Sequence, residues 1–323
     1  MESNRTKLIQ LLSNHTDDYI SGEQLSTALG ISRTAIWKHM NDLKKDGYEI
    51  EAVRNKGYRI MKVPTELSAA SLQWGLKTKW LGKHLIHRNS VDSTQYLAHD
   101  EARNGAPHGT VIIADHQTKG RGRLRRPWHS ADQHGLWFTI ILRPSRLEPK
   151  DATQLTLVAA VALAETYRNF GVEVKIKWPN DVFSNHLKLT GILTEMQAEQ
   201  DQIDYILLGI GMNINQSKDD FPAELREKVT SLKLESGKTS DLNVVFHDVA
   251  RQIEEKYDTF IEEGFERIKA EWEKQAYQLN EWITVKTKES FRAKFLGIEN
   301  DGALRIEDEF GKQSVLYSAE IIW

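Results

Sequence analysis

A stretch of this chain, residues 120–128 (Gly-Arg-Gly-Arg-Leu-Arg-Arg-Pro-Trp), places four arginines within six positions. Guanidinium groups bind phosphate or carboxylate oxygens in pairs, and glycines let backbone N–H groups close around the same oxygens. Because these charges repel one another, we expect the stretch to be mobile until an anion binds. It predicts a site for a polyanion, while a solvated basic loop or a second nucleic-acid patch stays open as an alternative.

A second set of charged residues follows a predicted strand, in Lys177-Trp178-Pro179-Asn180-Asp181. Ligands of α/β sheets bind where strands end. Lys188 is expected on a neighbouring, paired strand, which would place it at the same edge of the sheet as Lys177 and Asp181. Two lysines and a carboxylate suit neutralising a reacting phosphate and holding a metal or an incoming amine. Taken singly, each lysine is more typical of a solvated surface charge.

Two more motifs lie at the ends of predicted strands. Residues 92–95 (Asp-Ser-Thr-Gln) can cap a helix, or hold a ureido or carboxylate group at its N-terminus. Residues 209–213 (Gly-Ile-Gly-Met-Asn) lack the third glycine of a dinucleotide fingerprint, which would stand at Ile214. A phosphate-binding P-loop fails too, because Leu232 stands where its first glycine is required. Any ATP site must therefore use another arrangement.

The elements that position these motifs form a mixed α/β domain. Hydrophobic periodicity predicts helices at 94–103, 152–170 and 242–263, and strands at 84–91, 110–115, 136–142, 174–178, 189–196 and 203–214. From residue 282 only short strands follow, at 283–288, 291–298, 303–307 and 314–317, with a hairpin turn at 300–302. This end is expected to be a small SH3-like barrel.

The N-terminal pattern predicts a winged helix-turn-helix. Helices are expected at 5–12, from Ser21 to Leu29 and, capped by Ser32, at 33–46, followed by strands 49–53 and 58–61. Residues 33–62 carry eight basic and four acidic side chains, in a chain whose net charge is −3. The candidate DNA contacts are Ser32, Arg33, Thr34, Trp37, Lys38, Arg54 and Lys56. A winged helix used only for protein contacts is the alternative.

Length and composition set limits on the class of protein. A chain of 323 residues is expected to hold several domains, here 1–63, 67–275 and 276–323, in an α+β multidomain fold. The absence of cysteine excludes disulfides and thiolate chemistry, so no resident metal site is expected. The longest apolar stretch, 155–164, is too short to span a membrane. A cytoplasmic protein without a membrane partner is the expectation.

Together, the motifs at 92–94, Gln117 with 120–123, 177–181, Lys188 and 209–213 resemble the biotin protein ligase family. With the basic head in front, the chain resembles its bifunctional class, which also represses the biotin operon. The resemblance implies a catalytic domain with a class II synthetase-like mixed sheet. It also implies a biotin–[biotin carboxyl carrier protein] ligase reaction. Biotin and MgATP would give biotinyl-5'-AMP, and a lysine of the biotin carboxyl carrier protein of acetyl-CoA carboxylase, or of a related carboxylase, would then displace AMP.

The resemblance also implies roles for individual residues. Biotin would contact Ser93, Thr94, Gln95, Gln117, Arg121, Gly122, Arg123 and Lys188; ATP and the adenylate would contact Arg121, Arg123, Arg126, Trp128, Lys188 and Asn213; Arg123, Lys177, Asp181 and Lys188 would be catalytic. Leu124 and Arg125 receive no role. Operator DNA and, when the adenylate is bound, a second copy of the chain would be partners. A lipoate-type ligase and a catalytically dead biotin sensor are the alternatives.

Overall fold

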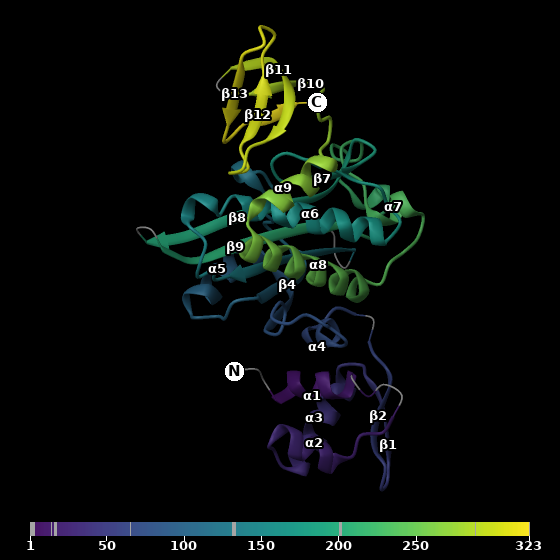
Figure 1. Ribbon diagram of the computed structural model, residues 1–323. Helices are drawn as coiled ribbons and strands as arrows, with labels where there is room; N and C mark the ends of the chain where they lie inside the picture. The colour runs from purple at the N-terminus through teal and green to yellow at the C-terminus, as the bar shows by residue number, and fades with distance from the viewer. Residues whose placement is uncertain are drawn as a thin grey trace.

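In the computed structural model, the chain forms three parts that follow one another in sequence (Figure 1). The structure describes residues 4–13, 15, 18–64, 66–130, 134–199, 202–287 and 289–322. A small helical head lies at one end, a seven-stranded sheet with its helices lies in the middle, and a five-stranded sheet lies at the other end (Figure 1). No helix within these ranges is long and apolar enough to cross a membrane.

The head contains the predicted three helices and hairpin. They are α1 (Asn4–Ser13), α2 (Gly22–Leu29), α3 (Arg33–Lys45), β1 (Glu49–Val53) and β2 (Gly57–Lys62). Ser21 and Ser32 start α2 and α3 by accepting hydrogen bonds from backbone N–H groups, as their N-cap positions predict. Ile36, Met40 and Leu43 of α3 are buried in the head's own core, so the opposite face of α3 is free to contact a partner.

A short helix that periodicity did not predict, α4 (Ala69–Gln73), joins the head to the middle part. Ala70 is buried in the core of the head, whereas Leu72 is buried in the core of the middle part. Just after α4, the ring of Trp74 lies 5.8 Å from that of Tyr48 in the head. This helix therefore packs against two cores at once.

The middle part is built on a mixed sheet of order β3-β4-β5-β9-β8-β7-β6. Its strands are β3 (Leu85–Val91), β4 (Thr110–Gln117), β5 (Gly135–Leu142), β6 (Lys175–Lys177), β7 (Asp181–Ser184), β8 (Leu187–Glu199) and β9 (Gln202–Asn213). β3 and β4 are parallel, and the other neighbours are antiparallel. The six predicted strands are thus confirmed to within a few residues, and β7 is an addition.

Helices cover both faces of this sheet. α5 (Thr94–Arg103) packs on one face with Ile112, Ile141 and Leu207. The other face carries α6 (Gln154–Asn169), α8 (Leu242–Glu263) and α9 (Phe265–Lys274) (Figure 1). Shorter pieces are α7 (Leu232–Ser236), η1 (Arg123–Arg125), η2 (Pro149–Asp151) and η3 (Lys218–Asp220).

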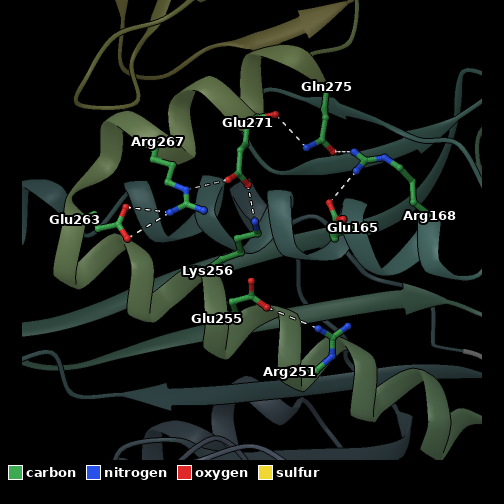
Figure 2. A network of polar contacts seen from close by, with 9 residues as sticks. All are labelled: Glu165, Arg168, Arg251, Glu255, Lys256, Glu263, Arg267, Glu271 and Gln275. Atoms are coloured by element: carbon green, nitrogen blue, oxygen red, sulfur yellow. Dashed lines mark hydrogen bonds and ion pairs between the residues drawn. The ribbon is translucent and has the colours of Figure 1, made fainter.

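Charged side chains connect the outer surfaces of α6, α8 and α9 (Figure 2). Lys256 of α8 lies 2.6 Å from Glu271 of α9, and Arg267 of α9 lies 3.1 Å from Glu263 at the end of α8. Arg168 of α6 donates to Gln275, which follows α9. The contacts of Lys256 with Glu271 and of Arg168 with Gln275 link different helices, so they support the packing of α9 against α6 and α8.

The C-terminal part is an antiparallel sheet of order β13-β12-β11-β10-β14. Its strands are β10 (Trp282–Lys286), β11 (Ser290–Ile298), β12 (Leu304–Glu307), β13 (Gln313–Leu316) and β14 (Glu320–Ile322). The β11–β12 turn docks on the middle part, where Trp178 Nε1 donates to the carbonyl of Gly302 (3.0 Å) and Gln154 Nε2 donates to that of Asn300 (2.9 Å). This contact places β14 beside the strand ends of the middle sheet.

Candidate active site

A cavity of about 610 Å³ opens between the middle sheet and the C-terminal sheet. It brings together residues that are far apart in the sequence. The predicted site residues among its lining are Ser93, Thr94, Gln95, Gln117, Arg121, Gly122, Arg123, Arg126, Trp128, Lys177, Asp181 and Lys188. The cavity wall therefore contains each predicted ligand or catalytic residue except Asn213.

Part of the cavity wall is formed by buried, uncharged polar groups. Gln117 Oε1 accepts hydrogen bonds from the backbone N–H (2.9 Å) and the hydroxyl (3.2 Å) of Thr94, while Gln117 Nε2 donates to Ser130 (3.0 Å). Thr139 donates to Gln95 Oε1 (3.0 Å). Gln95 Nε2 has no partner among the described residues although it is buried. A buried donor without a partner is costly, so this wall is suited to a ligand carbonyl.

The indole of Trp128 lies across two glycines that face each other on neighbouring strands. Gly191 of β8 pairs with Gly211 of β9. A Cβ atom added to Gly191 would lie 2.8 Å from the indole, and one added to Gly211 would lie 2.4 Å from it. Glycine at these two positions is therefore required for the close approach of the ring.

The arginine segment, residues 120–128, forms a compact turn. The N–H of Gly122 donates to the carbonyl of Arg126, and that of Trp128 donates to the carbonyl of Gly120, each at 2.8 Å. Leu124 and Arg125 at the tip have φ of 55° and 60°. Left-handed backbone at two side-chain-bearing residues stores strain, which is typical of a functional turn.

Three different elements hold three arginines of this segment apart. Arg121 Nη2 lies 3.2 Å from Glu195 of β8, and its guanidinium lies 4.8 Å from the ring centre of Tyr96. Arg123 Nη1 donates to Asn180 Oδ1 at 3.2 Å. Arg126 Nη2 donates to Glu320 Oε1 at 2.7 Å. Carboxylates thus engage Arg121 and Arg126, whereas the partner of Arg123 is an uncharged amide.

Two lysines and a carboxylate face the segment from the other side. Lys188 Nζ lies 2.8 Å from Asp181 Oδ1 and 5.4 Å from the ring centre of Trp128. Burial lowers the pKa of Lys177 to about 8, although the nearby Asp181 acts in the opposite direction. A partly desolvated ammonium group binds phosphate strongly because water screens it less.

The motifs of this chain match two family models. Residues 88–213 match the biotin/lipoate A/B protein ligase family, and residues 4–59 match a helix-turn-helix domain. The bifunctional ligase/repressor BirA of Bacillus subtilis is 44% identical over 319 residues, which are 98% of this chain and 98% of that protein. This chain belongs to the bifunctional ligase/repressors of the biotin/lipoate A/B protein ligase family.

More distant members of the family match over most of the chain. The bifunctional ligase/repressor BirA of Escherichia coli is 31% identical over 307 residues, 94% of this chain and 92% of that protein. Among solved structures, the biotin protein ligase of Aquifex aeolicus in complex with biotin and ATP is 32% identical, with a TM-score of 0.65, and covers 74% of this chain and 98% of its own. The central mixed sheet is therefore a ligase fold of this family.

Asn213 is the predicted site residue that does not line the cavity of this family member. It is 3% exposed, and its Nδ2 donates to the carbonyl of Thr230 at 3.0 Å. It lies two residues beyond Gly211, which does line the cavity behind Trp128. The amide of Asn213 therefore does not reach the cavity, although a residue two positions earlier on the same strand lines it.

Several residues of the site were not found from the sequence. They are Ser130, Thr139, Trp178, Asn180, Glu195, Lys286 and Glu320. Asn180 and Trp178 lay inside a recognised motif, and only their contacts were unknown. Lys286 and Glu320 come from the C-terminal sheet, and no local pattern signals that a distant strand completes a cavity.

The predicted DNA contacts of this family member lie on the surface of the head. Ser32, Arg33, Thr34, Trp37, Lys38, Arg54 and Lys56 are all exposed. Trp37 is 59% exposed on α3, whereas its neighbour Ile36 is buried. An exposed tryptophan among cations on this helix is suited to an interface rather than to a core.

Proposed function

We propose that this protein is an ATP-dependent biotin protein ligase that also acts as a biotin-responsive repressor of the biotin operon. The observation that carries the ligase assignment is the composition of the cavity. Buried amides and hydroxyls in its wall suit an uncharged ureido head, and the cations that also line it suit a carboxylate beside a triphosphate.

In the first step, the biotin carboxylate attacks the α-phosphorus of ATP, the α–β phosphoanhydride bond breaks and pyrophosphate leaves. Ser93, Thr94, Gln95 and Gln117 bind the biotin head, with Gln95 Nε2 as the available donor. Arg121, Gly122, Arg123 and Lys188 hold the carboxylate end. Screening by cations is needed here because both reactants are anions.

The adenylate is held by the same segment. Arg123, Arg126 and Lys188 neutralise phosphate oxygens, Trp128 packs near the adenine and Asn213 recognises the base. For Asn213 to do so, its buried amide, which donates to the carbonyl of Thr230, has to become accessible from the cavity. In the second step, the neutral amine of a carrier lysine attacks the acyl carbon and AMP leaves, with Lys177 and Asp181 supporting the ATP or the acceptor side.

Magnesium would enter with ATP rather than occupy a resident centre. The described residues contain no cluster of three side chains able to ligate a metal. The cavity carboxylates in that part of the chain, Asp181 and Glu320, are each paired with a cation. Because Mg²⁺ commonly takes one or two carboxylates together with substrate phosphates, Asp181 is the candidate protein ligand.

The repressor activity uses the head on a homodimer. A single recognition helix with a small surplus of charge binds operator DNA weakly, whereas two heads on a dimer can read two half-sites. We propose that adenylate bound beneath the arginine segment favours the dimer, so biotin with MgATP tightens operator binding. A DNA titration and sedimentation with and without both substrates test this. If DNA affinity and molecular mass were the same with and without the two substrates, the sensor function would be wrong, whereas the ligase function would still stand.

We further propose how the parts of the chain contribute to these activities. The hairpin β1–β2 serves as the wing that contacts the DNA backbone. The middle sheet is class II synthetase-like, and the C-terminal sheet is an SH3-like barrel that completes the site for ATP or the carrier. The units are 1–63, 67–275 and 276–323. The acceptor is the biotin carboxyl carrier protein of a biotin-dependent carboxylase.

Pyrophosphate release by the purified protein tests the ligase assignment. ATP with biotin should release pyrophosphate, while ATP with lipoate should not. Addition of apo-carrier protein should make the release continuous, because transfer to its lysine frees the site. Release with lipoate alone would favour the lipoate-type alternative, and no release with either acid would indicate a dead sensor.

A further inference from the structure

The ion pair between Arg126 and Glu320 differs from the other tethers of the arginine segment. The partners of Arg121 and Arg123 come from the middle part, at Glu195 and Asn180. Glu320 instead lies on β14, so the 2.7 Å contact crosses from the segment to the C-terminal sheet. Arg126 and Glu320 both line the cavity. This tether is therefore positioned where a ligand can reach it.

Glu320 is an anion surrounded by the cations of the site. It pairs in register with Lys286 on the neighbouring strand β10. The hydrogen bond from Arg126 lowers the pKa of the Glu320 carboxyl, and Lys286 and Lys177 act in the same direction. The other cavity carboxylate in the described residues, Asp181, is engaged by Lys188. Glu320 thus offers Arg126 the kind of oxygen that a phosphate would offer.

We propose that Glu320 is a displaceable partner of Arg126. Its carboxylate holds the guanidinium in the ligand-free protein and is exchanged for a phosphate oxygen when ATP binds. The inference rests on the proposed ligase function, in which Arg126 contacts ATP. Glu320 is then a positioning residue, because it acts through Arg126. When ligand fills the cavity, the contact between the C-terminal sheet and the arginine segment is broken.

The exchange has a measurable consequence for nucleotide affinity. ATP has to compete with an internal carboxylate, so removing the negative charge of Glu320 strengthens binding. An exposed ion pair contributes about 1 kcal/mol, which corresponds to about a fivefold change in Kd. Removing the charge of Glu320 should also make the arginine segment more mobile in the ligand-free protein, because Arg126 loses its ion-pair partner.

The experiment compares Glu320→Gln with Glu309→Gln in the full-length protein. Glu309 is exposed on the β12–β13 turn of the same sheet and does not line the cavity, so the two variants change net charge equally. The probe is α,β-methylene-ATP titrated in the presence of biotin, because the bond that the reaction breaks is blocked. We expect a Kd about fivefold lower for Glu320→Gln and unchanged for Glu309→Gln. Glu320→Asp, which keeps a carboxylate, should stay near the wild-type Kd.

Two further readouts separate exchange from a general effect of charge or of folding. In an Arg126→Ala background, Glu320→Gln should no longer change the Kd. Trypsin should cleave the arginine segment of ligand-free Glu320→Gln faster than that of the wild type, and bound nucleotide should abolish the difference.

An equal or higher Kd for Glu320→Gln than for Glu309→Gln would overturn the inference, as would an undiminished effect in the Arg126→Ala background. Failure of the wild-type protein to bind the analogue would instead overturn the proposed function.

Discussion

The arginines of residues 120–128 share one sequence pattern but have different surroundings. Arg123 is half-buried and donates to Asn180, whereas Arg125 is exposed at the tip of the turn. Burial lowers the pKa of the Arg123 guanidinium, with Asp181 opposing the shift, yet an arginine stays protonated. Because Arg123 is partly desolvated and lines the cavity, its charge should interact with an anionic ligand more strongly than that of Arg125.

Replacing Arg123 with Ala should weaken retention of the adenylate far more than it disturbs the fold. A lost charge-assisted hydrogen bond costs about 1.5 to 3 kcal/mol, or about one to two decades in Kd. The Tm of the ligand-free protein should hardly change. Arg125→Ala is the matched control and should affect neither quantity. If the free energy of unfolding of ligand-free Arg123→Ala fell by as much as its free energy of adenylate binding, the arginine would be structural.

The lowered pKa of Lys177 predicts that nucleotide binding depends on pH. With a folded-state pKa of about 8 against an ordinary 10.5, the ammonium loses its proton as the pH rises above about 8. Affinity for α,β-methylene-ATP should therefore fall between about pH 7 and pH 9. The free energy of unfolding of the ligand-free protein should instead rise with pH between the two pKa values. In that range Lys177 keeps its proton in the unfolded chain but not in the folded one.

Titrations of the analogue across this pH range check the prediction, with urea unfolding of the ligand-free protein beside them. Lys177→Arg, which keeps its charge throughout, should give a flatter affinity profile. A wild-type affinity that is constant from about pH 7 to pH 9 would contradict a role for this titration in phosphate binding.

Among the secondary-structure elements, the sequence pattern predicted most helices and strands, including the three-residue β6, but it missed α4, α9 and β14. The amphipathic face of 242–263 corresponds to α8, and the strands of the middle sheet, apart from β7, were placed to within a few residues. The five-residue α4 and the three-residue β14 have too few residues to show a period. α9 did carry a signal, because Phe265, Ile268 and Trp272 are buried at helical spacing, but its proximity to α8 concealed it. The contribution of β14 to the site depends on long-range docking, which local patterns do not encode.

The docking of the C-terminal sheet can be tested at one glycine. Gly302 has φ of +84°, and a Cβ there would lie 2.8 Å from Leu157 of α6. Gly311 has φ of +79° but no atom within 4 Å of such a Cβ. Gly302→Ala should lower the free energy of unfolding by about 1 to 3 kcal/mol more than Gly311→Ala, since it adds a steric clash to the same backbone strain. Urea unfolding measures the difference, and equal effects would show that the turn does not need this close contact.

At the scale of the whole molecule, α4 is where the head meets the ligase part. Ala70 and Trp74 pack with the head, and Leu72 packs with the ligase core. The cavity itself contains no residue of the head among the described part of the chain. The two units are thus in contact without sharing a site.

A chain that begins near Glu66 should therefore still form the adenylate and biotinylate its carrier, but should no longer bind operator DNA. Some loss of biotin affinity is compatible with this, because removal of the head uncovers α4. Electrophoretic binding to operator DNA and transfer of biotin to the carrier measure the two activities separately. A folded truncated protein that forms no adenylate would contradict the independence of the units.

In the proposed mechanism, one cavity joins biotin to AMP and retains the product. Mass spectrometry of the intact protein, after incubation with biotin and MgATP and removal of free ligand, measures this directly. We predict a complex heavier than the protein by the mass of biotinyl-5'-AMP, formed with biotin and not with lipoate. A protein recovered without a bound adenylate and with no biotinyl-5'-AMP in solution would contradict the account, as would an adenylate formed with lipoate in its place.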